Sequence, residues 1–520
     1  MDTSSAPTRS RRAWVSEVTN RSGNGADAAA TATAESNFIK AMSLTDATML
    51  VAGTMIGSGI FIVSADIARS VMTPFWLIAV WVLTGVITLL GALAYGELAA
   101  MFPRAGGQYV FLRESMGPVV GFLYGWTLFI VIQTGTVAAV AVAFGKFLGV
   151  LWPAITPGLY AWFPHFSFTL GGGPVDVGLS PERVVALVTV WILTWVNLRG
   201  VRQGKLVQTT LTIAKAGVLA LLVILGLTVG RNATAIMANF GPGNFAPHVD
   251  LNGAFVIAFG AAMVGSLFSS DSWNNVTFAA AEVQNPKRNL PLSLAIGAGL
   301  VTVLYILANF AYLSVLPLHG TAGGASVLAR GIQFATQDRV GTATAEVIFG
   351  AAGGSIVAAA ILVSTFGCNN GLILSGARVY WAMARDGLFF ARAGTLSARE
   401  VPAFGLVIQA IWTSVLCLTG TYNQLLDYVI FAQLLFYAAT TTGLFVLRRK
   451  RPNAERPYRA LGYPVMPGLY ILLALGVALT LLLADKTRTQ ALAGLLIVCI
   501  GIPVYFLWRS AAGGTARHAD

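Results

Sequence analysis

The chain has 520 residues, of which 56% are apolar and only 10% are charged. Soluble domains are about 45–50% apolar and about 25% charged, so this chain has too few charges to cover a water-facing surface of its size. The composition excludes an ordinary soluble protein and predicts a membrane protein. Only three cysteines occur, each in an apolar stretch, and the four histidines are scattered, so neither a disulfide framework nor a metal site is expected.

Twelve apolar stretches are long enough to cross a bilayer, which requires about 20 apolar residues in a helix. They fall near residues 46–69, 75–100, 118–147, 182–198, 206–229, 252–280, 290–316, 345–381, 404–421, 424–447, 466–484 and 490–508. The sequence therefore predicts an all-α membrane protein with twelve transmembrane helices, in a single domain over 43–510. Tails over 1–42 and 511–520 flank it, and the first, rich in Ala, Thr, Ser and Gly, is expected to be disordered.

The net charge of +12 comes from basic residues that lie mostly on one side of this arrangement. With a cytoplasmic N-terminus, the inner loops receive most of them, including Arg448-Arg449-Lys450-Arg451, as the positive-inside rule requires. Contacts with anionic lipid head groups explain this charge better than nucleic acid does. We expect a multi-pass protein of the cytoplasmic membrane with both termini in the cytoplasm.

A glycine-rich motif, Gly53-Thr54-Met55-Ile56-Gly57-Ser58-Gly59-Ile60-Phe61, lies in the middle of the first stretch. Two glycines that flank a serine favour an unwound segment, which a membrane tolerates only where the freed backbone faces protein or a water-filled cavity. The spacing of Gly53 and Gly57 is also typical of a close-packing helix face. The spacing by itself leaves both interpretations open.

A second interruption lies in the sixth stretch, where serines, asparagines and an aspartate cluster between Gly265 and Asn275. Interruptions in the first and sixth spans are typical of a five-helix inverted repeat, with the substrate site at the midplane between the breaks. We expect repeats over 44–229 and 252–447, with residues 466–508 as an accessory helix pair.

Two facing breaks suit a zwitterion, because half-helix N-termini carry about +0.5 charge for a carboxylate and freed carbonyls accept an ammonium group. The predicted function is therefore a secondary amino acid transporter that works by alternating access. Exchange, proton symport and facilitated diffusion remain open at this point.

Further motifs accompany the first: Gly91-Ala92-Leu93-Ala94-Tyr95-Gly96-Glu97-Leu98, Pro103-Arg104-Ala105-Gly106-Gly107-Gln108-Tyr109, Trp273-Asn274, Glu282-Val283-Gln284-Asn285-Pro286-Lys287-Arg288-Asn289-Leu290-Pro291, and Ser375-Gly376-Ala377-Arg378. Together they resemble the amino acid, polyamine and organocation transporter superfamily, closest to the L-type amino acid transporters and their bacterial relatives. The resemblance covers most of residues 43–447.

The resemblance implies a substrate site at Ile56, Gly57, Ser58, Gly59, Phe268, Ser269, Asp271 and Asn274. Backbone amides of residues 57–59 would hold the substrate carboxylate, and the carbonyls of Ile56 and Phe268 would take its amine. The ring of Phe268 would close the site from outside, and Asn274 would hydrogen-bond the substrate. Asp271 departs from the L-type transporters, which have a small residue there, and bears on side-chain preference and proton coupling.

The resemblance also implies that Lys215 stands where sodium-coupled relatives of the fold bind an ion. Its ammonium would tether the fifth span to the first and eighth, where Ser364 and Thr365 offer hydroxyls, as a fixed cation or a proton carrier. Transport would then not need sodium. Glu97, near the cytoplasmic end of the second span, is expected to pair with an arginine.

The sequence also bears on other functions. A polyamine or other organic-amine transporter shares the pattern, whereas a membrane sensor would usually add a signalling domain and a channel a continuous polar lining. No catalytic, metal-spaced or phosphate-binding arrangement is present, and Gly171-Gly172-Gly173 follows no predicted strand, so neither an enzyme nor a cofactor is expected. Animal L-type transporters are joined to an accessory glycoprotein through a cysteine after the third span; residues 152–180 contain none, so no disulfide-linked partner is expected.

Overall fold

The computed structural model describes residues 38–155, 158–170, 173–246, 249–419 and 422–516. Its elements are α2 (Leu44–Met55), η1 (Gly59–Phe61), α3 (Ser64–Val71), α4 (Pro74–Met101), α5 (Gln108–Met116), α6 (Pro118–Thr127), η2 (Leu128–Ile132), α7 (Gln133–Leu151), β1 (Phe166–Leu170), β2 (Gly173–Val177), α8 (Pro181–Leu198), α9 (Val201–Leu227), α10 (Ala233–Phe240), α11 (Gly253–Ser269), α12 (Asn275–Phe278), η3 (Ala280–Glu282), α13 (Pro286–Val315), α14 (Val327–Arg330), η4 (Thr336–Asp338), α15 (Val340–Phe349), α16 (Ala351–Arg385), η5 (Ala391–Gly394), α17 (Ala403–Thr419), α18 (Tyr422–Lys450), α19 (Val465–Leu483) and α20 (Arg488–Ala516).

Several helices begin where the local sequence supplies a cap. The Ser43 side chain accepts a hydrogen bond from the Asp46 amide at the start of α2, and Thr73 and Ser180 cap α4 and α8 in the same way. A proline follows each of the last two caps, at the first helical position, where its missing N–H costs no hydrogen bond.

The predicted membrane spans correspond to helices. Among the described residues, nine helices are long and apolar enough to cross a bilayer. The predicted ninth span is α17, a shorter apolar helix, and the first and sixth spans are each divided into two helices. The chain is therefore a multi-helix membrane protein, with a single described hairpin of strands, β1 and β2, between α7 and α8.

The membrane-facing surface is visible on α8. Val188, Trp191, Ile192 and Trp195 are all exposed, and their spacing of three and four places them on one side of the helix. A row of large apolar side chains would be costly in water, and it fits lipid.

The structure differs from the prediction at the N-terminal tail. Residues 38–42 are ordered, because the Met42 amide donates to the Glu282 carbonyl at 2.9 Å and the Gln284 amide donates to the Met42 carbonyl at 2.8 Å. Phe38 and Met42 are only 4% and 2% exposed, and burial of their side chains explains the order. The rest of the predicted tail, residues 1–37, lies outside the described residues.

Three other features also differ from the prediction. The predicted span over 345–381 is divided between α15 and α16 at Gly350, whose φ of 73° suits glycine. α20 continues to Ala516, so the tail predicted from residue 511 is helical as far as that residue, and 517–520 lie outside the description. The glycines of 171–173 do follow a strand, β1, because residues 166–170 pair with 173–177.

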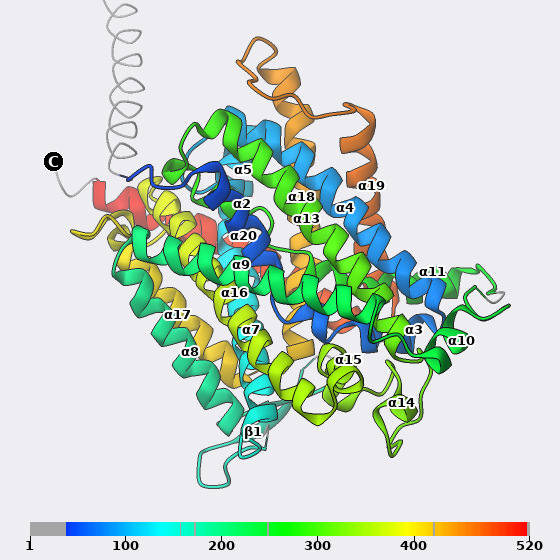
Figure 1. The fold of residues 1–520 in the computed structure, drawn as a ribbon. Helices are drawn as coiled ribbons and strands as arrows, with labels where there is room; N and C mark the ends of the chain where they lie inside the picture. Colours follow the sequence, from blue (N-terminus) through cyan, green and yellow to red (C-terminus); the bar gives the residue numbers. More distant parts are fainter. Residues whose placement is uncertain (1–37, 156–157, 171–172, 247–248, 420–421, 517–520) are drawn as a thin grey trace, which may run out of the picture.

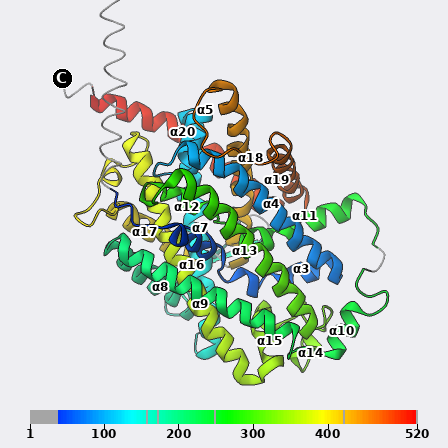
Figure 2. The same cartoon turned by 45° about the horizontal axis from the view of Figure 1, so that its top comes forward.

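The broken first span lies inside the bundle. α2 packs against α9, α13 and α16, while α11 of the sixth span packs against α3, α4, α18 and α19. Figures 1 and 2 both place α8 and α17 at one edge and α19 at the opposite edge. Figure 1 shows α5 and the segment between α18 and α19 at one end, which we call the basic end (residues 104–117 and 448–464). The hairpin end carries β1, β2, α14 and α15.

Candidate substrate site

The first span is broken at the predicted motif. α2 ends at Met55, Ile56 is extended with φ −73° and ψ 91°, and the chain resumes as η1 and then α3. The last bond of α2 runs from the Ile56 amide to the Ala52 carbonyl at 2.9 Å, and the next runs from the Phe61 amide to the Ser58 carbonyl at 3.1 Å. The amides of residues 57–60 lie between these two hydrogen bonds, where the first span is unwound.

The sixth span is broken over residues 270–274, between α11 and α12. Ser272 has a φ of 65°, in the left-handed region that is uncommon for residues other than glycine. Such a backbone costs of order 1–3 kcal/mol and persists only where the surrounding structure holds it. The predicted interruptions of helices 1 and 6 are therefore both confirmed.

The two breaks meet in the structure. The Thr54 hydroxyl donates to the Ser272 carbonyl at 2.9 Å, and the Tyr305 hydroxyl of α13 lies 2.9 Å from the Met55 carbonyl and 3.1 Å from the Ser269 carbonyl. A Cβ atom on Gly59 would overlap the Ser269 hydroxyl, so glycine is needed at this approach. Gly59 and Ser269, predicted from separate motifs, thus lie side by side.

The alternative interpretation of the first motif, a close-packing helix face, also holds, but at Gly53, one turn before Gly57. A Cβ atom on Gly53 would overlap Gln208 and Thr212 of α9, so this glycine permits close helix packing. Gly53 therefore serves packing, and the residues around Gly57 serve the break.

Lys215 is 1% exposed and points into the first break. Its Nζ atom donates to the carbonyls of Gly53 and Ile56, the latter at 2.7 Å, and lies 3.4 Å from the Ser364 carbonyl. The Ser364 hydroxyl lies 3.2 Å from the carbonyls of both Ile56 and Gly57. α9 and α16 thus hold the unwound carbonyls of the first span.

Two details differ from the prediction for this region. Lys215 meets Ser364 through the backbone carbonyl, and the Thr365 hydroxyl bonds the Ile361 carbonyl of its own helix at 2.9 Å, a common habit of helical threonine. The Ile56 carbonyl already accepts from Lys215, and the single Ser364 hydroxyl proton is shared between the Ile56 and Gly57 carbonyls, so a substrate amine would compete with these partners.

The side chains of Asp271 and Asn274 point toward α18. The Tyr437 hydroxyl lies 2.6 Å from Asp271 Oδ1 and 3.2 Å from Asn274 Oδ1. Asn274 Nδ2 donates to Gln108 Oε1 at 2.8 Å, and Gln108 Nε2 donates to Thr440 Oγ1 at 3.0 Å. A buried polar chain therefore links the second break to α5 and α18.

A cavity of about 20 Å³ borders this polar chain, lined in part by Thr88, Ser270, Asp271, Gln433 and Tyr437. The Gln433 Oε1 atom has no hydrogen-bond partner among the described residues. A water molecule needs about 10–15 Å³ of such space, so the volume of this cavity is sufficient for one water.

Phe268 lies in the last turn of α11, beside Ser269, and is 7% exposed. Burial of this kind is shared by a core side chain and by a lid closed over a site. Its role as a lid stays a prediction.

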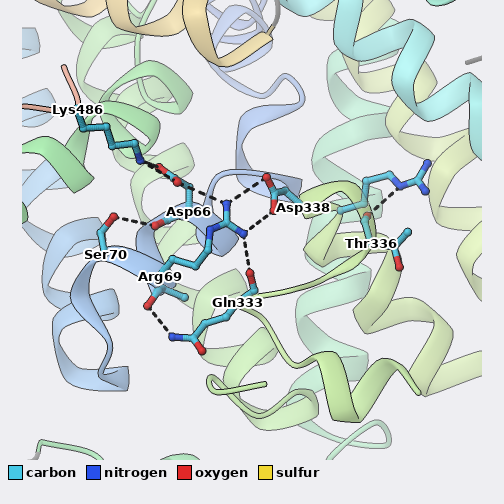
Figure 3. A network of polar contacts seen from close by, with 9 residues as sticks. Asp66, Arg69, Ser70, Gln333, Thr336, Asp338 and Lys486 are labelled. Carbon is cyan, nitrogen blue, oxygen red and sulfur yellow. Dashed lines mark hydrogen bonds and ion pairs between the residues drawn. The ribbon is translucent and has the colours of Figure 1, made fainter. Parts of the chain in front are cut away.

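A network of ion pairs and hydrogen bonds holds α3, the part of the first span that lies toward the hairpin end (Figure 3). Arg69 of α3 donates to Asp338 at 2.7 Å and to the Gln333 carbonyl at 2.6 Å, and Asp66 pairs with Lys486 at 2.8 Å. This network joins α3 to η4 and to the segment before α20.

The basic end has buried ion pairs of its own. Glu97 pairs with Arg448 at 2.5 Å and lies 3.2 Å from Arg456, and it accepts from the Ala460 amide at 2.7 Å. The expected pairing of Glu97 with an arginine is therefore confirmed.

A separate buried ion pair joins α16 to η3. Arg378 donates to Glu282 at 2.9 Å, and the Glu282 carbonyl accepts the backbone hydrogen bond from Met42.

Sequence reasoning missed Tyr305 and Tyr437, since an aromatic residue in an apolar span carries no distinguishing signal. Gln108 and Gln433 carried one, because amides are costly in a membrane unless they have partners. Among the described residues, no group of three or more His, Cys, Asp or Glu is placed to hold a metal ion.

Comparison with known proteins gives consistent matches. The profile of the family described as amino acid permease matches residues 42–503. The serine/threonine exchanger SteT of Bacillus subtilis (strain 168) is 30% identical over 481 residues, covering 91% of this chain and 98% of that protein. The b(0,+)-type amino acid transporter 1 of Mus musculus is 28% identical over 471 residues (90% and 88%), and the large neutral amino acids transporter small subunit 2 of Mus musculus is 28% identical over 470 residues (90% and 81%).

Proposed function

Because the chain belongs to the amino acid permease family, it is an amino acid transporter of the membrane rather than an enzyme, and we propose that its substrate binds between the two breaks. The resemblance to the amino acid, polyamine and organocation superfamily, and to its L-type members, is confirmed by the same matches. The observation that carries the proposed site is the junction of the two unwound segments through Thr54 and Tyr305.

In this proposal the amides of Gly57, Ser58 and Gly59 hold the substrate carboxylate. The ammonium group is taken by carbonyls of both breaks, at Ile56 and Phe268, and each of these carbonyls must exchange a present donor for the substrate, because Lys215 donates to the first and the Asp271 amide to the second. Residues 44–229 and 252–447 act as inverted repeats that alternately open the site to each side. Time-resolved uptake into proteoliposomes tests this: a sensor would bind an amino acid without accumulating it, and a channel would show no saturation.

Neutral α-amino acids are the first substrate class that we propose, since one similar protein is named a serine/threonine exchanger and another a transporter of large neutral amino acids. A cationic amino acid or a polyamine is the second candidate, because the Asp271 carboxylate is buried beside the second break and would attract a positive group. The neutral class is favoured by geometry, since Asp271 is turned to the Tyr437 hydroxyl.

Uptake of labelled L-serine, L-leucine, L-lysine and putrescine separates these classes. If substrates are neutral, serine or leucine is taken up and lysine fails to compete. If they are cationic, Asp271→Asn lowers lysine or putrescine uptake at least tenfold, while Asp485→Asn, a control at an exposed aspartate, leaves it unchanged.

Transport is proposed to be sodium-independent, by exchange or proton coupling, with Lys215 in place of a metal ion. Equal uptake in sodium chloride and choline chloride supports this, and strict dependence on sodium contradicts it. Faster uptake into vesicles preloaded with amino acid identifies exchange, whereas acidification of the vesicle interior identifies proton coupling.

The basic end is proposed to face the cytoplasm of the cell, with both termini on that side, because the cluster at Arg448–Arg451 lies there. The chain is proposed to work without a disulfide-linked partner, since residues 152–180 contain no cysteine. Uptake by the purified single polypeptide tests the second point, and protease access to tags on each terminus in sealed vesicles tests the first.

A further inference from the structure

We propose that α13 positions the broken first span for substrate binding, with Tyr305, Asn309 and Tyr312 as the positioning residues. The proposal rests on the substrate site proposed between the two breaks, which we call the midplane site. The spacing of four and three residues places the three side chains on one side of α13, and each is at most 1% exposed. A Cβ atom on Gly297 of α13 would overlap Val51 of α2, so α13 lies close to the first span.

The two tyrosines hold both ends of the unwound segment. The Tyr305 hydroxyl lies 2.9 Å from the Met55 carbonyl, and the Tyr312 hydroxyl lies 3.3 Å from the Ile60 carbonyl. The amides of residues 57–59, which are proposed to bind the substrate carboxylate, lie between these two carbonyls. A hydroxyl at each end therefore fixes the stretch of backbone that the substrate must contact.

Asn309 lies between the tyrosines and holds the start of α3. Its Nδ2 atom donates to the Tyr305 carbonyl of its own helix at 2.8 Å, and its Oδ1 atom accepts from the Ser64 hydroxyl at 2.7 Å. Ser64 is the first residue of α3 and is fully buried. α13 thus contacts the first span at three successive places: the end of α2, η1 and the start of α3.

The same side of α13 also reaches the second break. The Tyr305 hydroxyl lies 3.1 Å from the Ser269 carbonyl, in addition to its contact with Met55. A hydroxyl has a single proton, so the two carbonyls share one donor and must both stay close to it. Tyr305 therefore helps to set the separation of the two halves of the midplane site.

These contacts have two separable effects. Carbonyl groups freed by a break need partners in a membrane, so the hydrogen bonds contribute to stability. A binding segment that is already ordered also avoids the entropy cost of ordering on binding, so the same contacts strengthen substrate binding. We therefore expect their removal to weaken binding by more than the accompanying loss of stability explains.

Equilibrium binding to the purified full-length protein tests the tyrosines, with radiolabelled L-serine, L-leucine and L-lysine as probes. Tyr305→Phe should weaken binding by roughly threefold to tenfold, the usual effect of one hydrogen bond, and Tyr305→Phe with Tyr312→Phe by about tenfold or more. Tyr380→Phe is the matched control. The Tyr380 hydroxyl on α16 is buried and has no hydrogen-bond partner among the described residues, so its removal should leave binding unchanged.

A pair of buried asparagines separates positioning from stability. Asn239 of α10 donates to the carbonyls of Leu313 and Leu316 at 2.7 and 2.8 Å, away from both breaks. Asn239→Ala and Asn309→Ala should both lower the melting temperature, but only Asn309→Ala should weaken binding. Adding Ser64→Ala to Asn309→Ala should cause little further loss, because the two side chains act as a pair.

Two results would overturn the role of α13. The first is wild-type affinity both in Tyr305→Phe with Tyr312→Phe and in Asn309→Ala. The second is an equal loss of affinity in Asn239→Ala and Asn309→Ala, since affinity would then only follow stability. Failure of the midplane site is distinguishable, because Gly57→Leu would keep wild-type affinity. If Gly57→Leu loses binding while the α13 variants bind normally, the site stands and only the role of α13 is wrong.

Discussion

The ammonium nitrogen of Lys215 lies 2.7 Å from the carbonyl oxygen of Ile56, within the unwound part of the first span. The last carbonyls of a helix carry a partial negative charge, and α2 ends at this point. A buried cation placed there satisfies carbonyl groups that would otherwise have no partner in the membrane.

Lys215→Met should abolish or uncouple transport, because it keeps the length of the side chain and removes the charge that holds the first break. Uptake into proteoliposomes, in sodium chloride and in choline chloride, measures this effect. Lys287→Met is the control, since Lys287 pairs with Glu455 at an exposed position. Normal uptake by Lys215→Met with an unchanged pH profile would show that the lysine is only a packing residue.

Gly57→Leu should fold and lose binding at the midplane site, since the added side chain occupies the place of the substrate carboxylate. The structure adds a test of position: a Cβ atom on Gly57 would lie 3.2 Å from the Sγ atom of Cys368 on α16. Gly57→Ala should therefore weaken binding, and Cys368→Ala in the same chain should recover part of the loss. A coupling of about 0.5–3 kcal/mol in this double-mutant cycle is expected for residues in contact. Wild-type affinity in Gly57→Leu would contradict the site.

Phe268→Ala should reduce uptake strongly while changing the melting temperature little, if the ring closes over substrate. The control is Phe147→Ala on α7, a fully buried phenylalanine away from the breaks, whose truncation should cost about 3–5 kcal/mol of stability. If Phe268→Ala instead melts like the control and its folded fraction transports normally, Phe268 is a core residue.

Glu97→Gln should destabilise the basic end, because it leaves Arg448 and Arg456 without their buried counter-charge. Removing one partner of a buried pair costs about 3–5 kcal/mol, whereas exposed pairs contribute little. Thermal unfolding in detergent measures the loss. Glu455→Gln, at the exposed pair with Lys287, should melt like the wild type; equal melting of both variants would show that the Glu97 pairs add nothing.

Most of the architecture could be predicted from local patterns. Apolar stretches located the spans, and the clusters at Gly57 and Asp271 located both breaks, because hydropathy and unwinding tendency depend on neighbours in the chain. The division at Gly350 and the order of residues 38–42 could not be predicted, since the first depends on a single backbone angle and the second on contacts with residues 282–284.

The sequence by itself determined that this protein spans a membrane, that its first and sixth helices are interrupted, and to which family it belongs. Only the tertiary structure decided which groups meet there. Lys215 and Ile56 are separated by 159 positions, and Tyr437 and Asp271 by 166. Their contacts depend on how distant helices pack, and at a break the freed backbone groups bind whichever partners that packing brings within reach.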